Sequence, residues 1–189
     1  WRAKQLGADR VGQSIDDRRT GVAAWLSASG YTPRYTSWVL GIAAEDLPHS
    51  AGPARPEEYD VVLGLIEQAF SEHDDRHPVD LPRWRAMTVE RDGFAPEDLL
   101  VIREDTTPVA AAFLIDADEI WVDKLAVAAS ARGRGYARDL LAAARSRAAG
   151  RGYDRVRLST DSNTSALEVY TRLGMTVERS YTHWAVDLG

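Results

Sequence analysis

The sequence of 189 residues predicts a mixed α/β fold built around a central sheet. Two observations carry this prediction. Strand-like runs at 99–103, 108–115 and 119–128 follow one another with short turns between them. A glycine-rich turn then leads into an Ala/Leu/Arg-rich helical segment over 134–149, and another strand-like run follows at 155–160. Strands and helices therefore alternate in the second half of the chain.

Two helices are expected ahead of these strands. Apolar side chains recur at helical spacing from Glu57 to Phe70, and Pro56 stands just before them, where a helix tolerates proline. The apolar positions are Val61, Val62, Leu65, Ile66, Ala69 and Phe70. A second helix is expected over 82–91, with Pro82 at its start.

The loop between the two helices, 71–79, gathers groups that resemble metal ligands. It contains His73, Asp74, Asp75 and His77. These residues lack a regular ligand spacing, so we interpret the segment as a solvated loop and expect no metal site.

The end of the chain predicts a helix between strands. The helix is expected over 163–173, with Asp161 or Ser162 as its cap and Gly174 as its stop. Strands are expected at 175–177 and 181–188.

Composition limits the classes of function. The net charge of -6 argues against a general nucleic-acid binder, because such proteins usually carry a basic face. The absence of cysteine excludes disulfides, thiolate metal sites and cysteine nucleophiles. No apolar run approaches membrane-spanning length and no signal peptide is visible, so a cytoplasmic location without a membrane partner is the default expectation. Because the chain begins at Trp1 rather than Met, we expect a longer parent protein.

Residues 132–137, Arg-Gly-Arg-Gly-Tyr-Ala, lie between a predicted strand and a predicted helix. The first turn of a helix leaves backbone N–H groups unpaired, and glycines let the backbone approach an anion closely. Arg132 and Arg134 add mobile positive charge. The pattern favours a site for a phosphate or pyrophosphate, and the alternative is a tight connection with solvated arginines. The patterns of P-loops and of dinucleotide-binding folds are absent.

The first residues echo the last ones in order. Residues 7–11, 29–32 and 35–38 match 152–156, 173–176 and 181–184. We therefore interpret 1–47 as the C-terminal half of a duplicated domain, 48–56 as a linker and 57–189 as a complete domain. Half a domain would leave an unpaired sheet edge, so 1–47 is expected to pack against the complete domain or against a second chain in a homodimer.

At this point the residues resemble the GNAT superfamily of acyl-CoA-dependent N-acetyltransferases. Arg132-x-x-Gly-x-Ala fits its pyrophosphate motif, and Asn163-x-x-Ala-x-x-x-Tyr170-x-x-x-Gly174 fits its second motif. The resemblance covers roughly 55–189, with 1–47 as a partial copy. It implies a mostly antiparallel sheet with a splayed parallel strand pair, flanked by helices, plus an N-terminal half-domain.

The resemblance also implies acetyl-CoA as co-substrate, held between the strands at 119–128 and 155–160. The residues implied in binding it are Leu125, Ala126, Val127, Arg132, Gly133, Arg134, Gly135, Tyr136, Ala137 and Asn163. A backbone N–H near Leu125 would polarise the thioester carbonyl. For Asn163 the alternative is a purely structural role at the helix start.

The resemblance implies that Tyr170 donates a proton to the departing thiolate, and the alternative is a core aromatic side chain. The proton acceptor for the amine would be Asp123, with Glu119 second, and the alternative is that both are solvated carboxylates. Strand alternation predicts that Glu119, Trp121, Asp123 and Leu125 share one face. We interpret His183 as structural or pocket-lining.

The sequence therefore predicts transfer of an acetyl group from acetyl-CoA to a primary amine of a small molecule or peptide, by direct attack in a ternary complex. The alternatives are a non-catalytic acyl-CoA-binding or regulatory module, and transfer to a hydroxyl acceptor or from a longer acyl donor. When the copies are aligned on Gly30 and Gly174, Leu26 stands where Tyr170 does. We therefore predict that 1–47 is not catalytic.

Overall fold

A computed structural model describes residues 7–72 and 78–188 of the chain. Its strands are β1 (Arg10–Asp16), β2 (Thr32–Ala43), β3 (Gly52–Pro53), β4 (Leu99–Glu104), β5 (Thr107–Asp116), β6 (Ile120–Val127), β7 (Arg155–Asp161) and β8 (Thr176–Asp187). Its helices are α2 (Thr20–Ala28), α3 (Tyr59–Phe70), α4 (Leu81–Met87), α5 (Tyr136–Gly150) and α6 (Ala166–Arg172).

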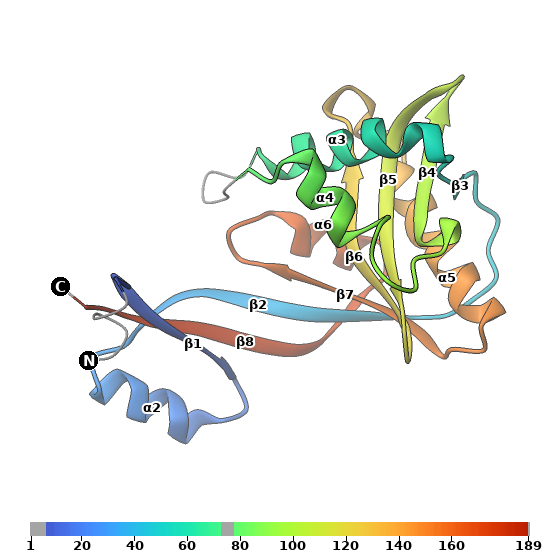
Figure 1. The fold of residues 1–189 in the computed structure, drawn as a ribbon. Helices are drawn as coiled ribbons and strands as arrows, with labels where there is room; N and C mark the ends of the chain where they lie inside the picture. Colours follow the sequence, from blue (N-terminus) through green and yellow to red (C-terminus); the bar gives the residue numbers. More distant parts are fainter. Residues whose placement is uncertain (1–6, 73–77, 189) are drawn as a thin grey trace. The chain divides into compact units, whose positions relative to one another are not determined.

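These strands form one mixed sheet in the order β1-β8-β2-β7-β6-β5-β4-β3 (Figure 1). The fold is the α/β fold that the sequence predicts, with one parallel pair, β6 and β7. The chain divides into two compact units. Unit 1 joins the residues up to Leu40 to those from Ser159 onward, and unit 2 is Gly41–Leu158.

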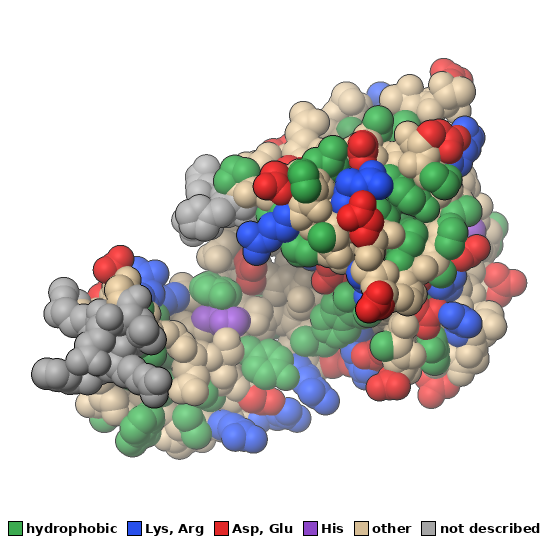
Figure 2. All heavy atoms as spheres, in the orientation of Figure 1, with side chains coloured by type: hydrophobic (Ala, Val, Ile, Leu, Met, Phe, Trp, Pro, Cys, Tyr) green, Lys and Arg blue, Asp and Glu red, His purple; other side chains and the backbone are tan. Residues whose placement is uncertain are grey.

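Unit 2 is built in layers around strands β3 to β6. Helices α3 and α4 cover one face of these strands, and α5 covers the other (Figure 1). Under α3 and α4 lies a core of buried apolar side chains. It contains Val62, Leu63, Ile66, Trp84, Leu99, Val101, Ala111, Phe113 and Ala126. The outer surface of α3 and α4 carries acidic, basic and apolar side chains side by side (Figure 2).

The two helices differ in detail from the sequence prediction. Helix α3 spans the predicted segment, but Val61, predicted among its apolar positions, is 58% exposed. Helix α4 ends at Met87 instead of 91. Thr88 leaves the helical conformation, and its hydroxyl donates to the carbonyl oxygen of Trp84 at 2.6 Å. The Trp84 carbonyl oxygen at the end of the helix thus accepts from a side chain, which competes with the backbone N–H that would continue the helix.

A β-bulge at Asp123 changes the direction of side chains along β6. Val122 pairs with Leu114 and Lys124 pairs with Phe113, so Asp123 is the extra residue opposite β5. The bulge reverses the alternation, and Trp121 and Leu125 therefore lie on opposite faces of the sheet. The prediction that Glu119, Trp121, Asp123 and Leu125 share one face is wrong for this reason.

The carboxyl-terminal end of α5 is fixed by a network of charged groups. Arg147 donates to Asp98 at 2.7 Å and to Asp116 at 3.2 Å. Arg151 and the Tyr153 hydroxyl also donate to Asp116, at 2.8 and 3.0 Å. Asp98 is 1% exposed, and a buried carboxylate of this kind is tolerated only with such partners. The network ties α5 to the turn before β4 and to the end of β5.

In unit 1, β1 pairs antiparallel with β8, from Arg10 opposite Asp187 to Asp16 opposite Tyr181. The chain's first strand is thus paired with its last. Strand β8 is one continuous strand, whereas the sequence predicts two. Helix α6 begins at Ala166 instead of Asn163, because Asp161 accepts from the backbone N–H of Asn163 at 2.9 Å and holds a turn there.

The backbone hydrogen bonds of the β1–α2–β2 segment recur in β7–α6–β8. Asp17 N–H donates to Ser180, and correspondingly Ser162 N–H donates to Thr36. Leu188 N–H donates to Asp9, and Ala44 N–H donates to Asp154. The ends of α2 and α6 also match: Gly30 N–H bonds to Ser27 and Gly174 N–H to Thr171, with both glycines at positive φ.

These bonds correct one detail of the predicted repeat. They equate Thr36 with Ser180, whereas the letter match equates Thr36 with Thr182. The alignment of β2 with β8 by hydrogen bonds is therefore displaced by two residues from the alignment by sequence. Because side chains alternate with period two, a displacement of two keeps each residue on the same face.

Glu58 provides a test of what holds β4 to the start of α3. Arg103 donates to Glu58 through Nε at 2.8 Å, and the side chain of Glu58 is 11% exposed. This bond, together with the backbone N–H of Arg55, lowers the pKa of Glu58 to about 2. We expect Glu58→Gln to lower the free energy of unfolding at pH 7 by about 1.5 kcal/mol, since hydrogen bonds between charged groups contribute about that much.

The expected pH dependence follows from the sign of the shift. A folded pKa below the unfolded value stabilises above the unfolded pKa, and the stabilisation is lost as pH falls through the folded value. The difference between wild type and Glu58→Gln should therefore shrink as pH falls from about 5 toward about 2. Urea unfolding at several pH values measures it. Glu57→Gln, which removes an exposed neighbouring charge, is the control; an equal loss in both variants would contradict the assignment.

Candidate functional site

The connection from β6 to α5 has the geometry of an anion site. After β6 ends at Val127, a short 3₁₀ turn (Ala129–Ala131) leads to Gly133 and Gly135. Their φ angles are 77° and 91°, a region that side chains with a Cβ rarely adopt. Gly135 stands at the N-cap of α5, and no side chain caps this helix. The N–H groups of its first turn are therefore not satisfied by a side-chain cap and can bind a ligand.

The two arginines of this loop are held by carboxylates. Arg132 pairs with Glu72 at 2.8 Å. Arg134 pairs with Glu104 at 2.6 Å, and a second nitrogen of its guanidinium donates to the carbonyl of Ser130 at 3.1 Å. The sequence predicts mobile cations here, but the structure places each in an ion pair. Arg138, in the first turn of α5, is exposed and was not predicted as part of the site.

Glu104 and Tyr136 form the second link between the loop and the end of β4. The Tyr136 hydroxyl donates to Oε1 of Glu104 at 2.7 Å, the same oxygen that Arg134 contacts. The hydrogen bond from Tyr136 and then the charge of Arg134 lower the pKa of Glu104. The same bond raises the pKa of the Tyr136 hydroxyl. Sequence reasoning missed Glu72 and Glu104, because nothing local in the sequence relates them to the loop.

Strand β6 presents the backbone that the resemblance assigns to the pantetheine arm. Leu125, Ala126 and Val127 pair with β5, opposite Ala112, Ala111 and Ala110. On its other side β6 pairs in parallel with β7 at the start of both strands, where Ile120 lies opposite Val156 and Trp121 opposite Arg157. The pairing therefore lies at the end of β6 remote from Leu125.

Both carboxylates predicted as proton acceptors are in ion pairs. Asp123 accepts from Lys124 Nζ at 2.7 Å, and that ammonium also lies 5.9 Å from the ring centre of Phe70. Glu119 pairs with Arg157 across β6 and β7. Each of the two carboxylates is therefore already engaged by a cation.

Tyr170 and Asn163 belong to unit 1. Tyr170 lies on α6 and is half-buried, and burial raises the pKa of its hydroxyl to about 12. It is therefore fully protonated at neutral pH. Asn163 is exposed and lies in the turn before α6. Unit 2 brings together Leu125–Val127, the loop 132–137, Asp123 and Glu119, and unit 1 contains the other two predicted residues.

His183 lies at the centre of a polar cluster in unit 1. Its Nδ1 and Nε2 atoms each lie 2.7 Å from a serine hydroxyl, Ser14 on β1 and Ser37 on β2. Its ring stacks on Tyr35 with centroids 4.0 Å apart. Burial lowers the pKa of His183, so the ring is neutral at pH 7, when one nitrogen donates and the other accepts. The cluster ties three neighbouring strands together.

Within residues 7–72 and 78–188 the structure contains no group of three or more His, Asp or Glu side chains placed to hold a metal. The predicted loop residues His73, Asp74, Asp75 and His77 lie outside the described residues. No helix in the described part of the chain is both long and apolar enough to cross a membrane.

The loop geometry and the sheet with its parallel pair agree with a family model described as "Acetyltransferase (GNAT) family", which matches residues 60–175. The chain belongs to this family. Its members are acetyltransferases that use acetyl-CoA as co-substrate, so the resemblance found in the sequence is confirmed at the level of family and fold.

Solved structures of this family share the fold. A GCN5-related N-acetyltransferase from Sphaerobacter thermophilus superposes with a TM-score of 0.77 at 26% identity, over 94% of this chain and 59% of its own. One from Kribbella flavida gives a TM-score of 0.61 at 21% identity, over 94% of this chain and 68% of its own. A GNAT-family acetyltransferase from Colwellia psychrerythraea gives 0.67 at 18% identity, over 93% and 65%. This chain thus spans 59% of the Sphaerobacter protein. Comparison with curated proteins gives no match.

Gly135 tests whether the loop depends on its left-handed backbone. No atom lies within 4 Å of the position a Cβ would take, so Gly135→Ala acts through the backbone alone. We expect the free energy of unfolding to fall by about 1 kcal/mol, the usual cost of a left-handed alanine. Gly150→Ala, at the other end of α5 and also without close neighbours, is expected to stabilise by about 0.5 kcal/mol. Thermal and urea unfolding measure both; equal effects would show that φ at Gly135 is not the constraint.

Proposed function

We propose that the protein is an N-acetyltransferase that moves an acetyl group from acetyl-CoA to a primary amine of a small molecule or peptide. The amine attacks the thioester carbonyl directly while both substrates are bound. Membership of the acetyltransferase family supports the transfer, and the name of the Sphaerobacter protein, an N-acetyltransferase at 26% identity, supports an amine acceptor.

One observation carries the proposal: the first turn of α5 has no side-chain cap, follows Gly133 and Gly135 at positive φ, and is flanked by arginines. A diphosphate supplies the acceptors that such a turn lacks. In this proposal the backbone of 132–137 holds the pyrophosphate of CoA. Leu125, Ala126 and Val127 would bind the pantetheine arm through their backbone, and Asn163 would lie near the thioester.

The proposed reaction moves one acyl group and one proton. The amine nitrogen forms a bond to the carbonyl carbon, the carbon–sulfur bond breaks, and the amine loses a proton while the thiolate gains one. Tyr170 is proposed as the donor to the departing sulfur, and its raised pKa keeps the hydroxyl protonated at neutral pH, so that it can hydrogen-bond to the sulfur as negative charge develops there. Asp123, or secondarily Glu119, is proposed to take the amine proton directly or through water. Holding both reactants in one site supplies much of the acceleration.

The ion pairs of Asp123 and Glu119 favour a second candidate, a non-catalytic acyl-CoA-binding or regulatory module. In each pair a cation already occupies the carboxylate that would have to contact the amine. The two candidates differ in one measurement: an enzyme releases free CoA from acetyl-CoA in the presence of its amine, and a binding module does not. A hydroxyl acceptor would be recognised by the same assay with alcohols in place of amines.

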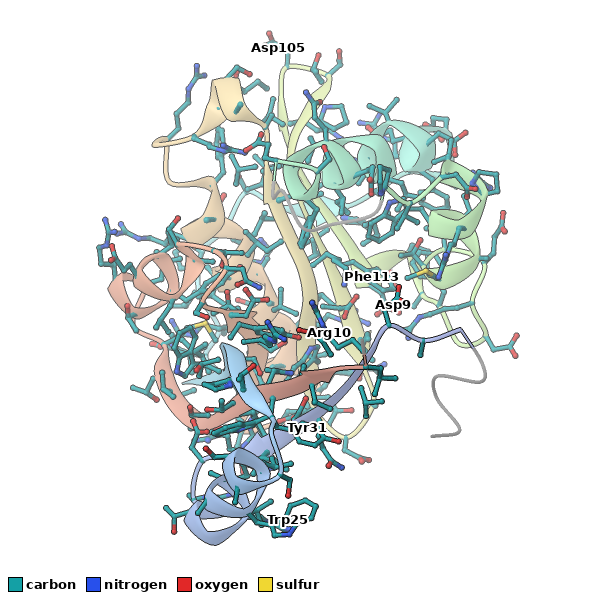
Figure 3. The ribbon with its side chains drawn as sticks, turned by 90° about the vertical axis from the view of Figure 1, so that its left-hand side faces the viewer. Asp9, Arg10, Trp25, Tyr31, Asp105 and Phe113 are labelled. Atoms are coloured by element: carbon teal, nitrogen blue, oxygen red, sulfur yellow. The ribbon has the colours of Figure 1, made fainter. Side chains whose placement is uncertain are left out.

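We further propose that 1–47 is a partial, non-catalytic copy of the C-terminal half, with 48–56 as a linker and 57–189 as the complete domain. The matching hydrogen bonds of β1–α2–β2 and β7–α6–β8 support a common origin. Leu26, the counterpart of Tyr170, is 1% exposed and packs in the core, while the adjacent Trp25 is 63% exposed and projects away from α2 (Figure 3). Association of two chains through 1–47 stays a prediction.

Tyr170→Phe tests the proposed acid. Because only the hydroxyl is lost, we expect the turnover number to fall by about 10²-fold, the scale of one proton-transfer contribution, while the Kd for acetyl-CoA stays within twofold. Turnover is measured by release of free CoA, and binding by calorimetry.

Tyr31→Phe is the matched control for this variant, since Tyr31 follows α2 in the same unit and is also half-buried. It should leave turnover unchanged. An unchanged turnover number for Tyr170→Phe would contradict the proposed role. If wild type releases no CoA with any amine in a broad panel, the binding-module candidate replaces the enzyme.

A further inference from the structure

Glu104 joins the loop of the proposed phosphate site to the hairpin between β4 and β5. It is the last residue of β4, and Asp105 beside it, at the tip of this hairpin, has a φ of 54° (Figure 3). One oxygen of Glu104 accepts from both Arg134 and Tyr136, at 2.6 and 2.7 Å. A single carboxylate therefore accepts hydrogen bonds from the second arginine of the loop and from the first residue of α5.

Glu72, just beyond α3, makes the equivalent contact with the other arginine. Its carboxylate lies 2.8 Å from Arg132, which also donates to the carbonyl oxygen of Val127 at 3.3 Å. The two glutamates come from different elements, yet each neutralises one arginine of the same short loop. A guanidinium binds a carboxylate and a phosphate through the same N–H geometry, so the two anions compete for the same donors.

We propose that Glu104 and Glu72 are built-in counter-ions of the phosphate site, which a diphosphate displaces from the arginines and which set the selectivity of the site for diphosphates over single phosphates. This inference rests on the proposed function, because it concerns the diphosphate of CoA. It adds two residues, neither in the family motif quoted above, that determine which anion is bound.

The exposure of the pairs makes exchange feasible. The side chains of Arg134 and Glu104 are 53% and 38% exposed, and those of Arg132 and Glu72 are 47% and 43% exposed. Ion pairs that are this exposed to water contribute little free energy. A ligand that makes more charge contacts and hydrogen bonds with the arginines can therefore displace the carboxylates. A diphosphate has two charged groups, so it can contact both arginines and also accept from the N–H groups of the first turn of α5. A single phosphate makes fewer of these contacts and is not expected to displace both carboxylates.

Tyr136 explains why Glu104 has a stable position after displacement. When Arg134 turns to a phosphate, the Tyr136 hydroxyl still donates to the same carboxylate oxygen. The exchange therefore leaves Glu104 with one hydrogen bond and open to solvent. It requires only the rotation of exposed side chains, with no change in the backbone of the loop.

The test measures the Kd of CoA, inorganic pyrophosphate and inorganic phosphate for wild type, Glu104→Gln, Glu72→Gln and the double variant by calorimetry. Glutamine keeps an acceptor for Tyr136 and removes only the charge. We expect each single variant to bind CoA about threefold to tenfold more tightly, as expected from removing one negative charge near a multiply charged ligand. The ratio of the Kd for phosphate to the Kd for pyrophosphate should fall from wild type to the single variants and again to the double variant.

Two controls make the result specific. Asp60→Asn removes an equal charge from an exposed pair with Arg85 at the opposite end of α3, about 18 Å from Glu72 at 1.5 Å per residue. It should leave all three Kd values unchanged. In an Arg134→Ala background, which should itself weaken CoA binding, Glu104→Gln should tighten it by a smaller factor than in wild type, because no arginine has to be released and only the through-space repulsion between Glu104 and the diphosphate is removed.

The outcomes separate this inference from the function on which it rests. Unchanged or weaker CoA binding in both Glu104→Gln and Glu72→Gln, with wild type binding CoA normally, overturns the counter-ion role and leaves the acetyltransferase proposal intact. Failure of wild type to bind CoA at all overturns the proposed function. Thermal unfolding of each variant shows whether a weaker Kd comes from a misfolded loop, and the two glutamates provide independent variants for that comparison.

Discussion

The candidate site depends most on one constraint: the first turn of α5 has backbone N–H groups that no side chain caps. Two features of α5 and the loop before it fix the position of this turn. Gly133 and Gly135 let the chain turn into the helix without a Cβ in the way, and Arg147 anchors the far end of α5 to Asp98 and Asp116. A helix held at its carboxyl end presents its amino end at a defined place, which a phosphate site requires.

The bulge at Asp123 is the second determinant of the site. Without it, Leu125 and Val127 would lie on the same face as Trp121, over α3 and α4. The extra residue turns them to the face that α5 covers, while Ala126 enters the core beneath α3. The last residues of the strand, which lead into the loop 132–137, therefore face α5. One inserted residue thus determines that the side chains at the end of β6 face the helix that follows the strand.

What the sequence predicts well here is local, and what it misses depends on distant partners. The glycine-rich turn, the helix α3 and the strands β4 to β7 follow from patterns within short segments, and the structure has them. The bulge at Asp123 depends on register against β5, which no local pattern encodes. Glu104 meets Arg134 only because a hairpin and a loop converge, so its role in the candidate site was not readable from sequence. Helix α6 starts later than predicted because Asp161 accepts from the backbone N–H of Asn163 and forms a turn. An aspartate can cap a helix or form such a turn, and the local sequence does not distinguish the two.

The repeated segment shows how the same backbone serves packing in one place and a proposed chemical role in another. Helices α2 and α6 end with the same bonds to a glycine at positive φ, so the two segments share their geometry at this point. The side chain one turn earlier differs: Leu26 is buried, and Tyr170 carries a hydroxyl whose pKa is raised by its surroundings. A leucine in this position packs against apolar neighbours and carries no hydroxyl. Main-chain hydrogen bonds of this kind form with either side chain, so the backbone geometry at the ends of α2 and α6 does not depend on the tyrosine hydroxyl.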